Sequence, residues 1–197
     1  HEITLLTLGP LTNVAVAAGL AGDFDDLLGG LVCLGGAIQS AGDVTAVAEF
    51  NVMADCQSAR RVLCSTATKT LVPLDVSRAV VLSPEKSRRL LAEAPTRVEQ
   101  FLERLLPFSI RAHHQFVGIE GVVMHEMAGL AATTRPGLFD RQPLVIDVET
   151  GGELTRGMTV LDRRERSGQP ANIEACVAVD NQGVLDYFTE VVQGAGP

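Results

Sequence analysis

Apolar positions in the first third of the chain come in short runs that predict buried strands, each followed by a stretch with helical spacing. Residues 3–8 are apolar on both faces, which is the pattern of a strand inside a parallel sheet with a neighbouring strand on each side. A Gly-Pro turn ends that strand. Thr12 or Asn13 is then expected to cap a short alanine-rich helix over 14–18.

The same order of strand, tight turn and helix recurs along the next sixty residues. Residues 27–34 predict a second strand that ends at two glycines, residues 54–64 have helical spacing, and residues 69–76 predict a third buried strand. These alternations predict an α/β fold with an open, mostly parallel, doubly wound sheet and helices on both of its faces.

The later part of the chain predicts helices first and short strands afterwards. Ser83-Pro84-Glu85 starts a helical region that Pro95 and Pro107 are expected to break up, and a helix of small residues follows His125. Short apolar runs predict a small antiparallel meander, and a last helix is expected over 181–192. The runs of the meander are 143–148, 158–161 and 175–179.

Composition narrows the classes of protein and partner. The chain has 197 residues, of which 46% are hydrophobic and 20% charged, so residues 1–197 are expected to form one domain around one core. The net charge is −8 and no basic stripe is present, which argues against nucleic acid or an anionic membrane as a partner. A small neutral molecule is the expected partner.

Cysteine usage and the length of the apolar runs indicate the compartment. No apolar run approaches the ~18 residues of a membrane span, and no signal sequence is evident. The cysteines lack CxxC spacing and lie among apolar residues, which favours small buried side chains in a reducing compartment over a disulfide or a zinc site. They are Cys33, Cys56, Cys64 and Cys176. The sequence therefore predicts a cytoplasmic protein.

The strongest candidate chemistry lies in residues 34–51, where a glycine-rich loop leads to Glu49 and Asn51. A carboxylate that accepts O–H donors and an amide that both donates and accepts suit a pocket for a hydroxylated small molecule. A solvated loop fits the spacing equally well. In open α/β sheets ligands bind at the carboxyl ends of the strands, where this loop and Leu8 are expected to converge.

The chain also carries an ordered series of sequence blocks. They are TLGPLTNVAVA (7–17), LGGA (34–37), AEFNVMADCQSARRVL (48–63), VPLDVS (72–77), the pair His125-Glu126, and VIDVETGGELTRGMTVLD (145–162). In this order, and over essentially the whole chain, the blocks resemble the nucleoside hydrolases of the inosine-uridine type. The resemblance implies cleavage of the N-glycosidic bond of ribonucleosides by water, on an α/β sheet with a bound calcium ion.

Matched positions imply how such a site would hold its substrate. By resemblance, Glu49 faces the 5′-hydroxyl, Asn51 faces the ring hydroxyls, and Phe50 either faces away or lines the pocket. His125 matches a position at the base-side end of the site and is a candidate general acid, because an imidazole titrates near neutrality. Asp75 is expected at a strand end, where it orients its neighbours.

The metal side of the site departs from the family pattern. By resemblance, Leu8 offers its backbone carbonyl to calcium, but the aspartate-rich motif that supplies other ligands is absent from this chain. Glu126 stands where the family has an aspartate ligand, so the carboxylate is displaced by on the order of 1 Å. Asp43 stands where the family has an asparagine, so an acceptor replaces an amide donor next to the substrate.

The sequence therefore predicts the later portion of a calcium-dependent ribonucleoside hydrolase, with a homo-oligomer as a further implication of the resemblance. Two alternatives stay open. A non-catalytic relic would bind ribose or nucleosides without its metal. An incomplete fragment would not fold stably alone, because the strand at residues 3–8 would lack a partner on one side.

Overall fold

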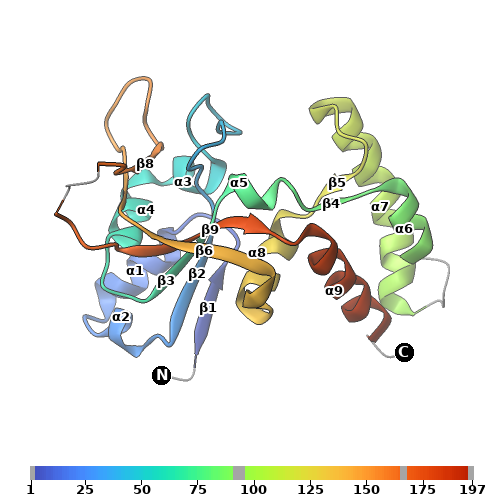
Figure 1. The fold of residues 1–197 in the computed structure, drawn as a ribbon, viewed down its shortest axis with the longest axis horizontal. Coiled ribbons are helices and arrows are strands. Elements are labelled where there is room, and N and C mark those ends of the chain that lie inside the picture. Colours follow the sequence, from blue (N-terminus) through green and yellow to red (C-terminus); the bar gives the residue numbers. More distant parts are fainter. Residues whose placement is uncertain (1–2, 91–95, 165–167, 195–197) are drawn as a thin grey trace.

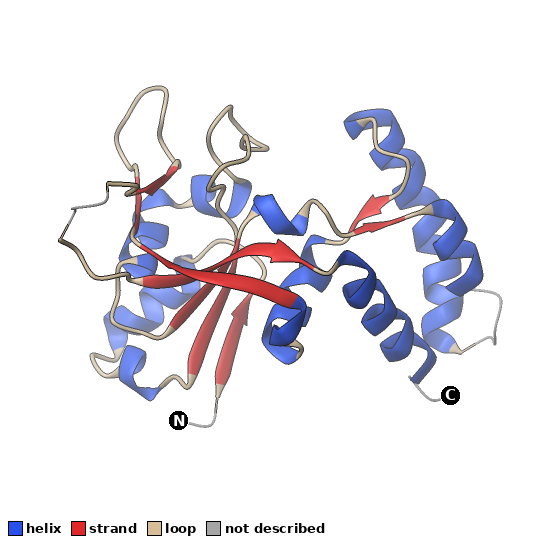
Figure 2. Ribbon diagram, viewed as in Figure 1, coloured by secondary structure: helices blue, strands red, loops and turns tan. Residues whose placement is uncertain are grey.

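A five-stranded sheet forms the centre of the molecule, in the order β1-β2-β3-β9-β6 (Figure 1). The computed structural model describes residues 3–90, 96–164 and 168–194. Strands β1, β2, β3 and β9 run parallel, and β6 runs antiparallel to β9 (Figure 2). The predicted α/β class with a mostly parallel sheet is confirmed. The strands are β1 (Thr4–Thr7), β2 (Gly30–Leu34), β3 (Lys69–Val72), β9 (Ile173–Val179) and β6 (Phe139–Leu144).

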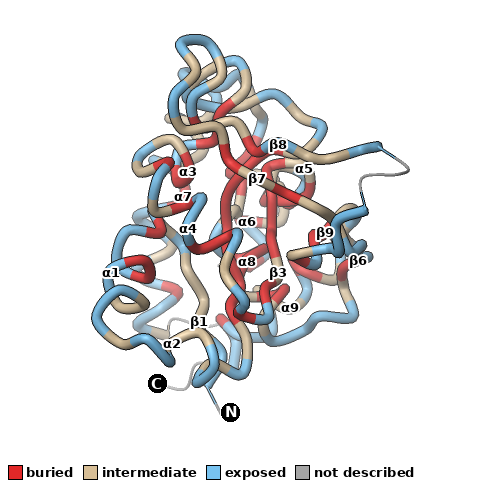
Figure 3. Tube along the Cα trace, turned by 90° about the vertical axis from the view of Figure 1, so that its left-hand side faces the viewer, coloured by how far each residue is buried: buried red, intermediate tan, exposed pale blue. Residues whose placement is uncertain are grey.

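Helices cover both faces of this sheet because apolar side chains alternate between the two faces. Leu31 and Cys33 of β2 pack in one core with α1 (Thr12–Leu20) and α4 (Cys56–Leu63). Val32 and Leu34 pack in the other core with α8 (His125–Thr134) and α9 (Asn181–Gly194). In Figure 3 the buried segments gather along β3 and α8. A strand that is apolar on both faces is what such a two-sided arrangement requires.

The remaining elements connect these layers or extend beyond them. Helices α6 and α7 lie at the opposite end of the molecule from β1, where the pair β4 and β5 leads to them (Figure 1). The bounds are α2 (Phe24–Leu27), α3 (Phe50–Ala54), α5 (Leu74–Ser77), β4 (Val81–Leu82), α6 (Pro84–Leu90), α7 (Arg97–Val117), β5 (Val122–Val123), the 3₁₀ turn η1 (Pro136–Leu138), β7 (Ile146–Val148) and β8 (Thr159–Leu161).

Among the described residues, strand β1 pairs with one of the two neighbours that its sequence predicts. Within the described ranges it pairs only with β2, in the register Thr4 to Gly30 through Thr7 to Cys33. Its residues are exposed or half-buried, whereas β2 is almost entirely buried. Apolar residues on both faces of a strand report that both faces are covered, and they say nothing of the two hydrogen-bonding edges. The second neighbour that the sequence predicts for this strand therefore stays a prediction.

Two other predicted strands are too long. The strand predicted over 69–76 ends at Val72, because Pro73 has no N–H for the sheet and instead caps α5. The strand predicted over 27–34 begins only at Gly30, after the short helix α2. The end of β3 matters for function, since it places Asp75 on a helix rather than at a strand end.

Two predictions about helix boundaries are also wrong. Helix α7 runs without a break through Pro107, whose exposed position leaves the carbonyl one turn earlier on the solvent side. Pro95 lies outside the described residues. Leu11, with no side-chain hydrogen bond, takes the N-cap position of α1, and the hydroxyl of Thr12 instead donates to Asp55 Oδ2 at 2.7 Å.

The late antiparallel strands exist, but they are divided between two sheets. The predicted strand over 143–148 splits at Val145, so that β6 joins the main sheet and β7 pairs with β8. Of the four free cysteines, Cys64 is exposed rather than buried, and its thiol contacts Asp147. None of the helices in the described part of the chain is long and apolar enough to cross a membrane.

Candidate functional site

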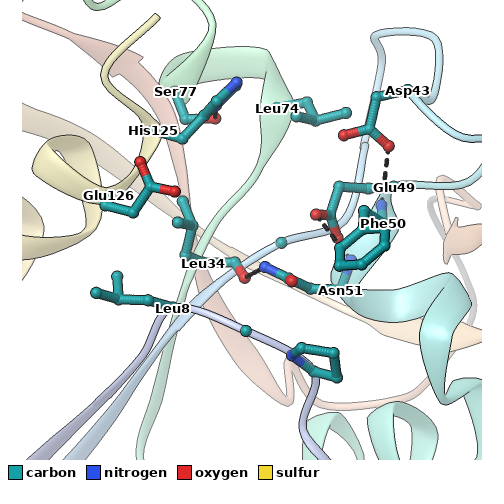
Figure 4. A pocket seen from close by; sticks show the side chains of 13 residues that line it. Leu8, Leu34, Asp43, Glu49, Phe50, Asn51, Leu74, Ser77, His125 and Glu126 are labelled. Carbon is teal, nitrogen blue, oxygen red and sulfur yellow. Dashed lines mark hydrogen bonds between the residues drawn. The ribbon is translucent and has the colours of Figure 1, made fainter. Parts of the chain in front are cut away.

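A pocket of about 290 Å³ opens at the carboxyl ends of β1, β2 and β3 (Figure 4). This is the edge where the sequence predicts a ligand site. Helices α3 and α8 begin at the pocket and bring polar residues to it from opposite sides. The lining residues are Leu8, Gly9, Pro10, Leu34, Gly35, Asp43, Glu49, Phe50, Asn51, Leu74, Ser77, His125 and Glu126.

Glu49 is a buried carboxylate whose oxygens accept three backbone hydrogen bonds. It is the N-cap of α3, where Oε1 accepts from Asn51 N at 2.9 Å and Oε2 from Val52 N at 3.2 Å. Oε2 also accepts from Gly36 N at 2.9 Å. Gly35 leaves room for this contact, because a Cβ there would lie 2.8 Å from Oε2 and φ is +151°. The sequence therefore needs glycine at position 35 so that the backbone can approach Glu49.

Burial also changes how readily Glu49 ionises. The side chain is only 5% exposed, and this desolvation raises the pKa of Glu49 above its ordinary 4.5 although three N–H donors act in the opposite direction. The nearby carboxylate of Asp43 raises the pKa further. A carboxylate has about four acceptor positions, so three backbone donors leave one for a ligand hydroxyl.

Asn51 is anchored by one half of its amide. Nδ2 donates to the carbonyl of Leu34 at 2.9 Å, which joins α3 to the end of β2. In the described part of the chain Oδ1 accepts no hydrogen bond, and Asn51 lines the pocket. The amide can therefore offer Oδ1 to a hydroxyl without giving up its anchor.

Asp43 and Phe50 form the outer rim of the same wall. Asp43 Oδ1 accepts from Phe50 N at 2.8 Å, and this bond is drawn in Figure 4. Phe50 is 56% exposed, and of its two expected placements it takes the one that lines the pocket. All four residues that the sequence assigns to substrate binding lie on this side of the pocket.

His125 stands across the pocket from that wall, as the first residue of α8. Its Nδ1 lies 2.9 Å from the hydroxyl of Ser77, a buried residue of α5. Burial lowers the pKa of His125 below 6.5, and the carboxylates of Glu126 and Asp43 oppose that shift. Ser77 is a site residue that sequence reasoning missed; its place at the end of the VPLDVS block was the available signal.

Leu8 and Glu126, the two expected calcium ligands, line the pocket near β1. Leu8 is 44% exposed and Glu126 is exposed. Calcium takes about six to eight oxygen ligands, and these two residues supply two. Within the described ranges no group of three or more His, Cys, Asp or Glu side chains could hold a metal ion. The described residues therefore do not make a calcium site by themselves.

Several named proteins are similar to this chain in sequence. The family model for inosine-uridine preferring nucleoside hydrolase matches residues 1–186. The pyrimidine-specific ribonucleoside hydrolase RihA of Shewanella oneidensis is 34% identical over 198 aligned residues, which cover 100% of this chain and 62% of the relative. The non-specific ribonucleoside hydrolase RihC of Shigella boydii is 32% identical over 195 residues, 98% of this chain and 61% of the relative.

Solved structures share the fold. A purine-preferring ribonucleoside hydrolase from Gardnerella vaginalis superposes with a TM-score of 0.89 at 27% identity, over 98% of this chain and 61% of that one. The plant nucleoside hydrolase PpNRh1 gives a TM-score of 0.86 at 26% identity, over 97% of this chain and 62% of that one. This chain thus spans about three fifths of the length of these proteins. From the family model and these relatives, the chain belongs to the inosine-uridine preferring nucleoside hydrolase family.

Proposed function

We propose that this chain carries the sugar- and base-binding part of an enzyme that hydrolyses the N-glycosidic bond of ribonucleosides to free base and ribose. One observation carries the proposal. Glu49 and Asn51 present acceptor atoms to one side of a pocket whose other side holds His125. We further propose that residues 1–197 act as one nucleoside-hydrolase-like domain and that the four free cysteines reflect a reducing compartment such as the cytoplasm.

The wall of Glu49, Asn51 and Asp43 is suited to the ribose. The remaining acceptor position of Glu49 and the free Oδ1 of Asn51 match sugar hydroxyl donors. Departure of the base leaves an oxocarbenium-like ribosyl group, and hydroxyl contacts that strengthen as charge develops lower the barrier. Two nearby carboxylates, Glu49 and Asp43, favour that positive charge electrostatically.

His125 is suited to protonate the leaving base. The hydroxyl of Ser77 engages Nδ1, which leaves Nε2 as the nitrogen for the substrate. Because burial lowers the pKa of His125, the protonated form that a general acid needs predominates only at a pH below that lowered pKa. Base release that depends on this acid should therefore rise as the pH falls through the pKa of His125.

The described residues alone do not account for activation of the attacking water. Calcium binding through the carbonyl of Leu8 and the carboxylate of Glu126 is part of the proposal, and it needs roughly four more oxygen ligands. Among the named relatives, one is pyrimidine-specific, one is non-specific and one is purine-preferring.

A second candidate function is binding of ribose or nucleosides without turnover. It is favoured by a contrast between the two sides of the pocket. On the sugar-facing wall, formed by Glu49, Asn51 and Asp43, the side chains of Glu49 and Asn51 are hydrogen-bonded to the backbone. The metal side, formed by Leu8 and Glu126, has only these two candidate ligands among the described residues. Calorimetry with ribose, inosine and uridine, each with and without calcium, separates the two functions. Binding without release of base and without an effect of calcium supports the second.

The direct test of the first function is chromatographic detection of free base after incubation of the chain with inosine or uridine and calcium. We expect base release by the wild type, and a loss of about 100-fold in His125→Ala, the size of a general-acid contribution. Asp162→Asn is the control, because Asp162 is paired with Arg164 outside this pocket. Binding without detectable base release would support the binding function alone. If the chain neither bound nucleosides nor released base, both functions would be contradicted.

A further inference from the structure

Helix α5 holds the loop before Asp43 through one carboxylate. Asp75, the second residue of α5, points its side chain at three consecutive backbone N–H groups. The donors are Ile38 N at 2.8 Å, Gln39 N at 2.7 Å and Ser40 N at 2.9 Å. The hydroxyl of Ser40 adds a fourth contact at 3.3 Å. A single side chain thus fixes the direction of three successive peptide units.

Arg78, the residue after α5, holds the next two peptide units by their carbonyls. Nη1 donates to Ala41 O and Nη2 donates to Gly42 O, each at 2.9 Å. The planar fork of a guanidinium is what permits two parallel bonds of this kind. Leu74 N also donates to Gly36 O at 2.9 Å. The segment from residue 36 to residue 42 is therefore tied to α5 along its length.

Burial contributes little to the shape of this loop. Gln39, Ala41 and Asp43 are exposed, and Ile38, Ser40 and Gly42 are only half-buried. A loop with few buried apolar contacts opens easily unless hydrogen bonds hold it. The carboxylate of Asp75 is suited to hold the loop because it stays charged. Burial alone would raise the pKa of Asp75, but the N–H donors outweigh burial and keep that pKa below 3.8.

The same helix also contacts the opposite side of the pocket. Ser77, its last residue, holds Nδ1 of His125, and Leu74 lines the pocket. Figure 1 shows α5 beside α8, and Figure 4 shows Asp43 and His125 on either side of the pocket mouth. One four-residue helix is thus bonded to the loop that carries the sugar-side rim and to the base-side histidine.

We propose that Asp75 and Arg78 are positioning residues of the nucleoside site, which fix the segment 38–42 to α5 and so set the place of Asp43 relative to His125. The proposal rests on the proposed function, because it assigns a purpose to the pocket between these residues. Neither Asp75 nor Arg78 lines the pocket, so both act through the residues that do.

The test combines amide hydrogen exchange with ribose binding in three variants. Asp75→Asn keeps the size of the side chain but turns one acceptor oxygen into a donor that faces N–H groups. Arg78→Lys keeps the charge but not the two-carbonyl fork. Asp162→Asn is the matched control, since Asp162 is a carboxylate that also accepts a backbone N–H, from Arg164, outside this pocket.

In Asp75→Asn we expect exchange at Ile38, Gln39 and Ser40 to accelerate about tenfold or more, the factor for 1.4 kcal/mol. The amide of Leu71 in β3 should be unchanged, which distinguishes local opening from global unfolding. The dissociation constant for ribose, measured by calorimetry, should rise about tenfold in Asp75→Asn and in Arg78→Lys. The control should match the wild type in both measurements.

Several outcomes separate this inference from the proposed function. Wild-type ribose affinity in both Asp75→Asn and Arg78→Lys would overturn the positioning role, even with faster exchange. Exchange that rises equally at Leu71 would overturn it too, because the effect would then be on the whole fold. If the wild type itself did not bind ribose or a nucleoside, the proposed function would fall, and local exchange alone would decide whether α5 holds the loop.

Discussion

The two sides of the pocket differ in how completely the chain builds them. On the sugar-facing wall, Glu49 and Asn51 are 5% and 9% exposed, and each is anchored to the backbone at the end of β2. On the β1 side, Leu8 is 44% exposed and Glu126 is exposed. Among the described residues, the side chain of Glu126 forms no hydrogen bond or ion pair.

The difference follows from where each wall sits in the sheet. The sugar-facing wall is anchored to the end of β2, which has a strand on each side. On the other wall, Leu8 follows β1, which pairs on one side within the described ranges, and Glu126 lies in the first turn of α8. A wall that is anchored before the ligand arrives loses little freedom on binding. The chain therefore contains a preorganised wall, which we propose binds ribose, next to a side with two proposed metal ligands.

The largest difference between the two walls is expected when one glutamate of each wall is replaced by glutamine. Glu49→Gln places a donor among three backbone N–H groups, so we expect about 3 kcal/mol of lost stability and no measurable ribose binding. Glu126→Gln changes an exposed side chain, and its unfolding free energy should stay within about 0.5 kcal/mol of the wild type. Urea unfolding and calorimetry measure both. Equal losses in the two variants would contradict the contrast between the walls.

A second pair of variants tests whether a pocket residue that is hydrogen-bonded to the backbone contributes more to stability than one that only lines the pocket. Asn51→Asp removes the donor to Leu34 O and sets an anion against that carbonyl, so we expect about 2 kcal/mol of destabilisation. Leu8→Ala shortens a side chain that is nearly half exposed, and should cost less than about 1 kcal/mol. Thermal melting of both variants measures these losses. Wild-type stability in Asn51→Asp would contradict the expected role of its hydrogen bond to Leu34.

A pH series sharpens the role of burial on the sugar-facing wall. Because burial raises the pKa of Glu49, the folded state holds this proton more tightly than the unfolded chain does. Its contribution to stability is complete below pH 4.5 and is lost as the pH rises through the folded pKa. Ribose affinity should run the opposite way and fall as the pH drops through that value, because protonation occupies an acceptor. Thermal melting should lose this pH dependence in Glu49→Gln, and calorimetry of the wild type should show the fall in ribose affinity.

Of these changes, the addition of calcium is expected to have the smallest effect, and that effect is measured on ribose affinity. With two candidate oxygen ligands, the β1 side should bind the ion no more tightly than about 1 mM, so calcium at lower concentrations should leave ribose affinity within about twofold. Calorimetry with and without calcium checks this. A strong calcium effect that disappears in Glu126→Gln would show that the metal side is more complete than the described residues indicate.

Much of the fold could be predicted from apolar spacing, because alternating burial on two faces leaves a direct record in a sequence. The order of the strands in the sheet could not, since hydrogen-bonding edges leave no such record. Pro73 gives the end of β3 correctly, whereas the apolar run around it predicts a strand that is too long. Pro107 shows the reverse, because an exposed proline is tolerated inside a long helix.

The shared position of Glu49 and Asn51 at one pocket was predictable, because the two residues lie close in the sequence. The contacts that hold the pocket residues were not, because the partners lie far apart in the sequence. Gly36 and Glu49 are 13 residues apart, and Leu34 and Asn51 are 17 apart. Ser77 and His125 are 48 apart. Asp75 was expected to orient its neighbours, and it does bind three of them, although from a helix and together with Arg78.

The most direct test of the central claim, that Glu49 and Asn51 form a preorganised ribose site, is an amide chemical-shift titration of the wild-type chain with ribose and with 2-deoxyribose. We predict saturable shifts at Gly36, Asn51 and Val52, whose N–H groups contact Glu49, and weaker binding of 2-deoxyribose. Shifts that bypass these three amides, or equal affinity for the two sugars, would contradict the account.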